Sequence, residues 1–329
     1  MKKVFLSLFV AMLATVAVQA QQIAVVTGST TKMCQTLKDA IEASSDGSVI
    51  YLPGGGFQIG DTVKITNQVT IMGIGHKANS ENADGNTVIS GNLFFNEGSS
   101  GSAVMGCYIS GNVVIGEDES SVNSIHIKYC NLNSVQVKNS NCWDLEVNQN
   151  YIRNVSDFRG NNATITNNIL HSICDVNGGL IANNLVLSWA EYRAGQYGLG
   201  YSYDVYSEAL IAYNTTVKNN IFIKNRFHGS GMITSSNMLS GTWGDECVNI
   251  GNTDWDGVFV KYNGGSITPA SDFHFKEAFQ QYSNIGIYGG TGFKDDAMPP
   301  APYIVEKEIP EQTDASGKLA IKIRVKASE

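Results

Sequence analysis

Three segments of the chain carry acids and bases at matching offsets from a repeated polar turn. Seven residues after the turn, successive copies carry Asp157, Asp175 and Glu191. Nine residues after it, they carry Arg159, Asn177 and Arg193. Because side chains alternate along a strand, these groups would face outward on one sheet. Ser156 and Cys174, which precede two of the acids, would then point inward.

Stacked carboxylates repel one another unless something compensates, which leaves three interpretations of this charged column. Arg159 and Arg193 would neutralise the acids as a salt ladder, which is the ordinary case on a surface. Alternatively, a Ca²⁺ ion would bind oxygens of Asp157, Asp175 and Glu191, and calcium is the one cofactor that the sequence suggests. In the third interpretation the carboxylates act as general acid and base on a glycosidic bond.

An insertion rich in aromatic residues follows the third copy, where the turn positions Asn184 and Asn220 are 36 residues apart. Its candidate sugar-contact residues are Trp189, Tyr192, Tyr197, Tyr201 and Tyr203. Aromatic faces with polar tips suit sugar rings, which stack through C–H groups and bond through hydroxyls. We therefore predict carbohydrate binding by these residues together with Arg159. The alternative is that the tyrosines only cover an exposed side of the molecule.

Basic residues lie close to this insertion in the sequence. A lyase that acts on a uronic acid needs a cation near the carboxylate and a base for the C5 proton. Arg193, Lys224 and Arg226 would bind the acid groups. Arg153 and His171 share a position three residues past the turn and form a reserve pair. A lone histidine is more often structural, so none of these residues is diagnostic.

A repeat in the middle of the chain must position these side chains. Each copy has an apolar residue, a polar turn ending in Cys or Asn, and another apolar residue two positions later. The turn-ending residues are Cys107, Cys130, Asn150, Asn168, Asn184 and Asn220. A period near 20 without a helical pattern predicts a solenoid with one repeat per coil.

The asparagines have a physical role in such a solenoid. Asn tolerates the left-handed backbone of a sharp bend, and its amide can bond to neighbouring backbone. With coils stacked about 4.8 Å apart, each amide would also bond to the next one. The rival fold, an antiparallel sandwich, would show Asn-Gly or Asp-Gly hairpin turns, which are scarce in the repeat.

On these residues the chain resembles the right-handed parallel β-helices of the pectin-lyase-like type. The resemblance rests on the TNNI, ANNL and KNNI turns and on residues 36–75, TLKDAIEASSDGSVIYLPGGGFQIGDTVKITNQVTIMGIG. It implies an all-β fold, a single-stranded right-handed parallel β-helix with a short N-terminal capping helix, and an active site on the sheet with the acids. The fold carries lyases, hydrolases, esterases and inert adhesins alike, so the resemblance is weak for activity.

The residues themselves support the capping helix. Thr36 is a suitable N-cap, and Leu37, Ala40 and Ile41 share one helical face. The predicted domains are a signal peptide over 1–20, the solenoid over 21–298 and a C-terminal β tail over 299–329.

Composition limits the class of partner. Only 16% of residues are charged, whereas soluble proteins have roughly 25%, and 34 Gly and 31 Asn are present. The formal net charge of −8 disfavours a nucleic-acid partner, which would need clustered Lys and Arg. Six cysteines without metal-site spacing are expected to be free, buried thiols.

The first 20 residues have the pattern of a secretory signal peptide. Lys2 and Lys3 precede an apolar run, and small residues end at Ala20. We therefore expect a secreted protein, in the periplasm, at the cell surface or outside the cell. No later segment has the length and hydropathy of a membrane span. A monomer is the default oligomeric state.

The tail has the alternation of a half-buried strand. Its apolar positions are Leu319, Ile321, Ile323 and Val325, and its basic positions are Lys322, Arg324 and Lys326. We expect it to pair with residues 303–309 and to lie on the solenoid, where it would cover the open end. A secretion or docking tag is the alternative.

These features predict an exported, carbohydrate-active protein that binds a polysaccharide beside residues 189–209. In its enzymatic form it would be a polysaccharide lyase, and a glycoside hydrolase is a further alternative. The catalytic candidates are Asp157, Asp175, Glu191, Arg193, Lys224 and Arg226. The rival class is a non-catalytic surface or adhesin-like solenoid that binds glycans.

Overall fold

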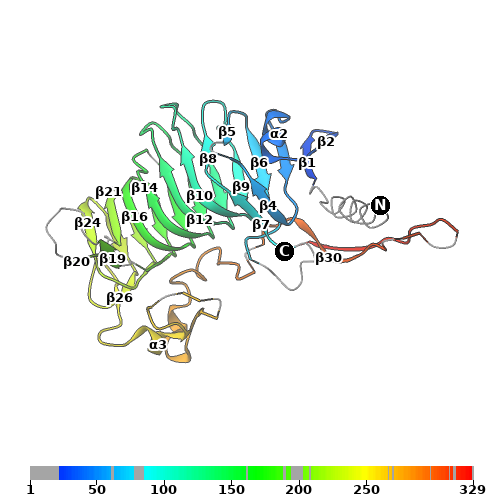
Figure 1. The fold of residues 1–329 in the computed structure, drawn as a ribbon. Coiled ribbons are helices and arrows are strands. Elements are labelled where there is room, and N and C mark those ends of the chain that lie inside the picture. Colours follow the sequence, from blue (N-terminus) through cyan, green and yellow to red (C-terminus); the bar gives the residue numbers. More distant parts are fainter. Residues whose placement is uncertain are drawn as a thin grey trace, which may run out of the picture.

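The computed structural model describes residues 22–60, 63–77, 85–160, 162–187, 190–193, 203–206, 209–265, 267–268, 270–296, 298–310, 312–313 and 316–327. In these ranges the chain winds into a parallel β-solenoid, which confirms the predicted fold class. Figure 1 shows the coils stacked side by side along one axis. No helix of the described residues is long and apolar enough to cross a membrane.

One wall of the solenoid, sheet A, precedes the asparagine turn. In spatial order its described strands are β2 (Thr30–Cys34), β1 (Ile23–Thr27), β3 (Ser48–Tyr51), β6 (Val69–Met72), β9 (Ala103–Met105), β11 (His126–Lys128), β13 (Glu146–Asn148), β15 (Thr164–Thr166), β17 (Leu180–Ala182), β22 (Thr216–Lys218) and β25 (Ile233–Ser235). From β3 onward neighbouring strands are parallel. β-Branched residues such as Ile127, Val147 and Ile165 align in register and fill the interior.

Sheet B follows the asparagine turn and has two limbs. The first limb contains β4 (Gly55–Gln58), β7 (Thr87–Ser90), the starts of β10 (Tyr108–Ile115), β12 (Asn131–Val137), β14 (Tyr151–Ser156) and β16 (Ile169–Asn177), and then β18 (Leu185–Val186), β23 (Ile221–Phe222), β26 (Met238–Leu239) and β27 (Val248–Asn249). The second limb contains the ends of the four long strands with β5 (Val63–Ile65), β8 (Leu93–Phe95), β21 (Leu210–Tyr213) and β24 (Phe227–Ser230).

The N-terminal end is closed as predicted. Helix α2 (Leu37–Glu42) begins after Thr36, whose Oγ1 accepts a hydrogen bond from the backbone N–H of Asp39 at 3.0 Å. Leu37, Ala40 and Ile41 are buried on the face that packs against the first coil. The β1–β2 hairpin lies beside this helix (Figure 1).

A ladder of buried asparagine amides joins the coils. Oδ1 of Asn168 accepts hydrogen bonds from the backbone N–H of Asn150 at 2.9 Å and from its Nδ2 at 3.1 Å. Nδ2 of Asn168 donates to the carbonyl of Val147 at 2.8 Å and to Oδ1 of Asn184 at 3.0 Å. Each amide therefore satisfies backbone groups inside the bend and links three coils, as the repeat had predicted.

The ladder is longer than the repeat had shown. Asn237 continues it, because its Oδ1 accepts from the backbone N–H of Asn220 at 3.0 Å. Cysteines flank it at both ends. Cys130 donates its backbone N–H to Oδ1 of Asn150 at 2.8 Å, and the pairing of β26 with β27 places Cys247 beside Asn237. The cysteines are free thiols, and burial raises the pKa of Cys130 to about 12.

The left-handed backbone expected of asparagines in the bend lies at the residue before the turn-ending Asn, with φ of 53°, 57° and 56° at Asn167, Asn183 and Asn219. The two residues of the bend have different roles, since the first reverses the chain and the second places its amide in the core. The left-handed residues form a second, outer column along the solenoid.

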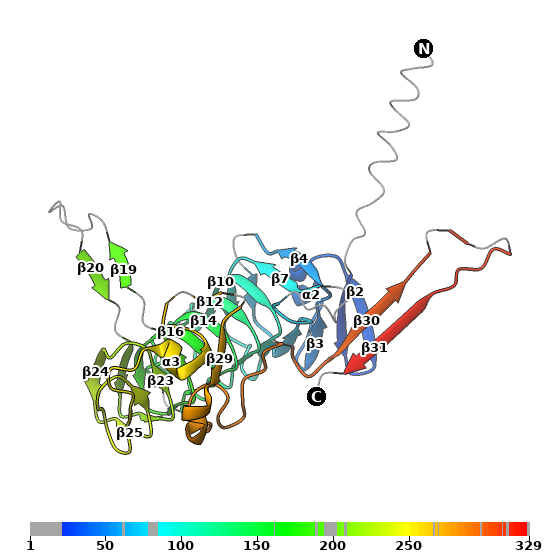
Figure 2. The same cartoon turned by 90° about the horizontal axis from the view of Figure 1, so that it is seen from below.

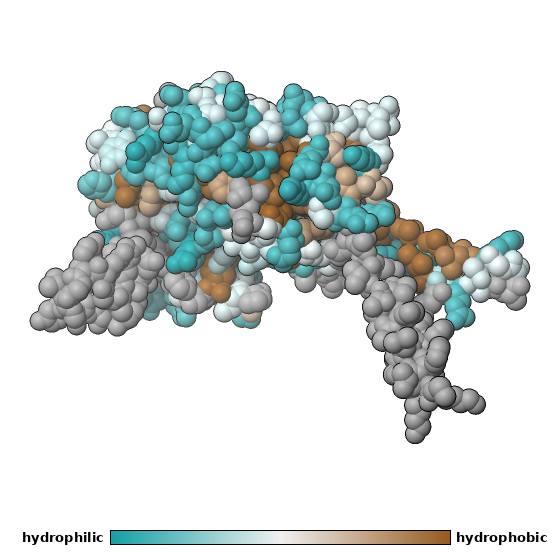
Figure 3. Space-filling view, turned by 45° about the horizontal axis from the view of Figure 1, so that its top comes forward, coloured by the Kyte–Doolittle hydropathy of each residue, from teal (hydrophilic) through white to brown (hydrophobic). Residues whose placement is uncertain are grey.

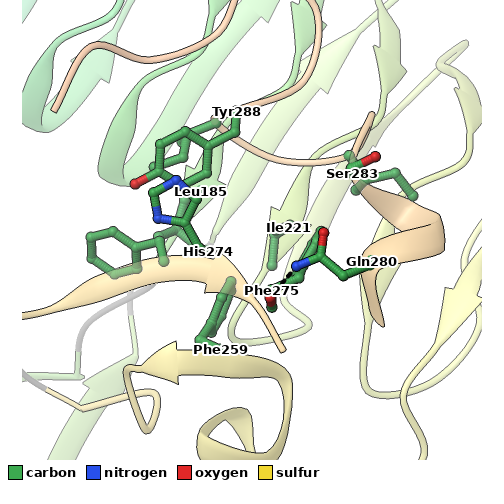
Figure 4. Close-up of a pocket in the computed structure, with 11 residues that line it drawn as sticks. Leu185, Ile221, Phe259, His274, Phe275, Gln280, Ser283 and Tyr288 are labelled. Carbon is green, nitrogen blue, oxygen red and sulfur yellow. Dashed lines mark hydrogen bonds between the residues drawn. The ribbon is translucent and has the colours of Figure 1, made fainter. Parts of the chain in front are cut away.

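The chain after β27 folds back over sheet B and forms a cover, residues 255–283. It contains α3 (Trp255–Val258), β28 (Phe259–Lys261), β29 (Asp272–Phe275) and the 3-10 helix η1 (Glu277–Tyr282). Its aromatic residues pack on Leu185, Ile221 and Met238 of the first limb. A small apolar cavity of about 60 Å³ lies between cover and sheet, and beside it the rings of His274 and Tyr288 stack with 3.9 Å between their centroids. Figure 4 shows the residues that line this cavity.

A strap, residues 284–299, then runs back toward the N-terminal coils along the outer column. Nδ2 of Asn183 donates to the carbonyl of Asn284 at 2.7 Å, and Nδ2 of Asn167 donates to that of Gly289 at 2.6 Å. Further along, the backbone N–H of Lys294 donates to Oε1 of Gln149 at 3.0 Å. The left-handed bend residues therefore hold the strap in sequence, one coil after another.

The tail differs from the prediction in part. β30 (Pro302–Glu308) pairs with β31 (Lys322–Ala327) as an antiparallel hairpin, which agrees with the expected pairing. However, the hairpin extends away from the coils instead of lying on them (Figure 2). Its apolar positions Leu319, Ile321, Ile323 and Val325 are 43–57% exposed, and Figure 3 shows apolar side chains gathered on this arm.

The ladder generates a stability prediction. Asn168→Ala removes an amide that makes four buried hydrogen bonds, so two backbone groups of the preceding coil and the side-chain amides of Asn150 and Asn184 lose a partner. At about 1–3 kcal/mol per unsatisfied buried group, we expect a loss of about 3–5 kcal/mol in the free energy of unfolding. Urea denaturation followed by circular dichroism measures it.

Asn133→Ala is the matched control, because Asn133 is exposed and its Nδ2 donates to the side chain of Asn112 instead of to buried backbone. We expect a loss below about 1 kcal/mol for this variant. Equal unfolding midpoints for the two variants would contradict the role of the ladder.

Candidate functional site

The structure brings Asp157, Arg159 and Asp175 together on the second limb of sheet B. Nη2 of Arg159 lies 3.3 Å from Oδ1 of Asp157 and 3.3 Å from Oδ2 of Asp175. Their side chains are 38–59% exposed, so water screens the attraction. One guanidinium thus bridges carboxylates of neighbouring coils, which is the geometry of the salt-ladder interpretation.

The backbone at these acids differs from simple alternation. Asp157 and Asp175 have φ of 65° and 55°, in the left-handed region. Asp175 lies within β16, where the register with β21 shifts between Ile173 and Val176, whereas Asp157 directly follows the end of β14. Ser156 and Cys174, which precede these two residues, are half-buried instead of inward, while Phe158 is buried. The prediction of an inward Ser156 and Cys174 is therefore wrong, because a left-handed residue interrupts strict alternation at each position.

Glu191 does not join this column. It lies in β19 (Ala190–Arg193), which pairs with β20 (Tyr203–Tyr206) as a separate antiparallel ribbon. β21 takes the place beside β16 on the second limb, so the expected stacking of Glu191 on Asp175 is wrong. The insertion interrupts the repeat, so a residue seven positions after Asn184 no longer occupies the same place on the sheet as Asp157 and Asp175.

The backbone of the ribbon places Arg193 opposite Tyr203 and Tyr192 opposite Asp204. Trp189, Tyr197 and Tyr201 lie outside the described residues. The roles expected of these residues in sugar contact stay predictions.

Lys224 and Arg226 are exposed and lie between β23 and β24. The carbonyl of Arg226 accepts hydrogen bonds from the backbone N–H groups of Ala209 and Leu210 at 2.9 and 3.2 Å. The backbone of this cationic segment is thus fixed where the chain returns from the insertion.

The calcium alternative at Asp157, Asp175 and Glu191 has no geometric support in the described part of the chain. No group of three or more His, Cys, Asp or Glu residues there could hold a metal ion. Arg159 already places its cationic group between the two aspartates.

A groove of about 380 Å³ lies on the first limb of sheet B, on its outer face. Two columns of outward side chains form its floor. The first groove column, one residue after the turn, contributes Tyr108, Asn131 and Tyr151, and the second, three residues after the turn, contributes Ser110, Asn133, Arg153 and His171. Ile267 of the cover also lines it.

The strand pairing sets this floor. Tyr108, Asn131 and Tyr151 are register partners on β10, β12 and β14, and Ile109, Leu132 and Ile152 behind them point into the core. This arrangement confirms that Arg153 and His171 share one column, as the repeat had indicated. Neighbouring coils thus offer aromatic faces, amides, a hydroxyl and a guanidinium at regular spacing.

The electrostatics of the groove favour a neutral histidine beside a cation. Burial, and then the positive charge of Arg153, lower the pKa of His171 to about 4. His171 is therefore an unprotonated base at neutral pH. Burial also raises the pKa of Tyr151, which stays a neutral phenol.

The sequence pattern of the coils marks this groove. The position one residue after the turn is polar or aromatic from Tyr108 to Tyr151 and apolar from Ile169 onward. The position three residues after the turn is polar from Ser110 to His171 and apolar at Leu187 and Ile223. The change of polarity marks where the cover begins. Only the fold of residues 255–283 shows that it also marks the edge of a groove.

The charged cluster generates a prediction about salt. Arg159→Gln leaves two carboxylates on neighbouring coils without their cation, and we expect a loss of about 0.5–1 kcal/mol in the free energy of unfolding at low salt. The loss should vanish in about 1 M NaCl, where the screening length is about 3 Å. Urea denaturation at the two salt concentrations measures it.

Lys38→Gln is the control, since the pair of Lys38 with Glu42 is exposed and 3.9 Å apart. We expect almost no effect from it at either salt concentration. A loss at Arg159→Gln that persists in high salt would show that the guanidinium packs instead of neutralising the acids.

Comparison with known proteins does not add a family to this geometry. No family model matches the chain, and no curated protein or solved structure is significantly similar to it.

Proposed function

We propose that the protein binds a polysaccharide along the groove of sheet B. The observation that carries this proposal is the composition of the floor. Tyr108 and Tyr151 offer ring faces for C–H groups, while Asn131, Asn133 and Ser110 offer donors and acceptors for hydroxyls. A groove of this size with aromatic and amide groups suits sugar rings.

The repeat of the floor favours a polymer over a small ligand. Each coil presents a similar pair of outward positions about 4.8 Å from the next, which is roughly the advance of a pyranose chain per residue. A chain of sugars can thus meet one pair of side chains per ring. The net charge of −8 argues against a nucleic acid at the same surface.

The site would act outside the cytoplasm. The signal-peptide pattern of residues 1–20 supports export, and the turn motifs support a relationship with pectin-lyase-like β-helices. The aromatic insertion at 189–209 is proposed as a second contact region for the same polymer.

The neighbouring Arg153 and His171 favour one reaction in particular, β-elimination in a polyuronate. Arg153 would pair with the carboxylate, which stabilises negative charge at C5. His171 would take the C5 proton, the electron pair would form the C4–C5 double bond, and the glycosidic oxygen at C4 would leave and take a proton from water. A neutral histidine is the form that this step needs.

A two-carboxylate hydrolase has less support at this groove. None of its described lining residues is Asp or Glu, whereas glycosidases ordinarily use a pair of carboxylates. The non-catalytic alternative keeps the same contacts and omits the proton transfer. Binding and elimination therefore need separate experiments.

Binding is tested on a glycan panel with two substitutions in the floor. We expect Tyr151→Ala and Arg153→Ala each to weaken the best ligand at least about 10-fold, because a stacking face or a charge-assisted hydrogen bond is lost. Glycan arrays followed by calorimetry on the best ligand measure the change.

Trp143→Ala is the control, because this aromatic residue is 49% exposed and does not line the groove. It should bind like the unmodified protein. If all three variants keep full affinity, the groove is not the binding site.

Elimination is tested by the rise in absorbance at about 235 nm that a C4–C5 unsaturated uronate produces. The rate should rise as pH increases through about 4, where His171 loses its proton, and stay level up to neutral pH. His171→Asn should lower the rate at least about 100-fold, the usual contribution of a general base.

The control for this reaction is the binding affinity of His171→Asn for the same polyuronate, which should change less than about 3-fold. A panel of polyuronates that gives no absorbance, with binding intact, would leave the non-catalytic function.

A further inference from the structure

We infer that the groove is closed at one end and therefore takes the end of a polysaccharide chain instead of its interior. This inference rests on the proposed function, and it adds the mode of binding. It follows from the way the exposure of the two groove columns changes along the solenoid.

The first groove column changes from open to covered within two coils. Toward the N-terminus it begins with the exposed Gly56, continues through Val88, and reaches Tyr108, which is 37% exposed. After Tyr151 the register partner is Ile169, which is 4% exposed. Its successors Leu185, Ile221 and Met238 are also buried.

The second groove column changes one coil later. Gln58, Ser110, Asn133 and Arg153 are exposed, and His171 is half-buried. The next members, Leu187 and Ile223, are 3% and 5% exposed. The first groove column therefore ends after Tyr151 and the second after His171, so both columns are covered from the coil of Leu185 onward.

The cover closes the groove there. Tyr262, Phe259 and Phe275 form one apolar cluster with Ile169 and Leu185. Tyr151 and Ile267 pack against the edge of this cluster, and both also line the groove. In Figure 1 the cover lies against the C-terminal coils and leaves the sheet free on the side of β7 and β10.

The length of the floor sets how much of a polymer it can take. The groove extends over the coils of Tyr108, Asn131, Tyr151 and His171, which is three coil spacings or about 14 Å. At about one ring per coil, three to four sugar residues fit before the chain meets the cover. A longer chain can only continue out of the open end.

The charge along the floor orients the ligand. The open half has neutral side chains, namely Tyr108, Ser110, Asn131 and Asn133. The cation Arg153 lies near the closed end, beside His171. The terminal sugar residues, and an acid group on one of them, would therefore lie deepest in the groove.

The experiment uses uronate oligomers of two to six residues, with the full-length protein and calorimetry as the readout. We expect affinity to rise with length up to about four residues and then to level off, because further residues lie outside the groove. Hexamers that carry a bulky tag at the reducing or the non-reducing end provide the decisive comparison. One tagged form should bind at least about 10-fold more weakly, and the other should bind like the free hexamer.

Equal binding of the free hexamer and both tagged forms would overturn the inference, because a through-going groove accepts the interior of a chain. Affinity that keeps rising from four to six residues would also overturn it. If no uronate of any length binds, the proposed function at this groove fails for uronates and takes the inference with it.

A substitution in the cover tests whether the cover closes the end of the groove. Ile267→Ala should reduce the difference in affinity between the two tagged hexamers at least about 3-fold, because it removes part of the side chain that blocks the end of the sugar chain. Ile233→Ala is the matched control, since Ile233 is 70% exposed on sheet A, away from the groove. An unchanged difference in both variants would show that the cover does not limit the ligand.

Discussion

The buried amide ladder is the interaction on which the rest of the structure depends. Every coil must bend between sheets A and B, and the bend brings backbone N–H and C=O groups into an apolar interior where they need partners. Asn150, Asn168, Asn184, Asn220 and Asn237 supply those partners with a neutral group. Because each amide also holds the next coil, the positions after the turn align from coil to coil. The columns that form the groove and the outer column that holds the strap both result from that alignment.

Much of the fold could be predicted because its cause is local and repeated. The turn residues recur with their apolar neighbours, so the ladder, the parallel walls and the α2 cap followed from the chain alone. Asp157 and Asp175 came together as predicted because both lie at the same offset within unbroken coils. Glu191 did not, because it lies in an insertion that forms its own ribbon. Offset arguments hold only while the coils continue without interruption.

The groove could not be predicted because its boundary depends on residues far away in the sequence. In the sequence, Tyr151 and Arg153 have the pattern of any solvated strand face. The cover, more than 100 residues later, buries Ile169 and Leu187 but leaves Tyr151 and Arg153 open. The tail shows the converse. Its alternation predicts a strand, and β31 is one, but alternation does not say what a strand packs on, and the apolar side of β30–β31 is exposed. Pattern identifies which residues share a face, and packing of distant segments decides what that face meets.

The strap has a consequence for how this architecture can change during evolution. Solenoids commonly gain or lose repeats, since each unit contacts only its neighbours. Here the backbone of residues 284–296 is matched to Asn219, Asn183, Asn167 and Gln149 in turn, from the C-terminal coils back toward the first ones. An added or deleted coil would shift every one of these contacts unless the strap changed its length by the same step. Duplication of a repeat, ordinarily the easy route to a longer protein of this kind, would here require two coordinated events in distant parts of the gene.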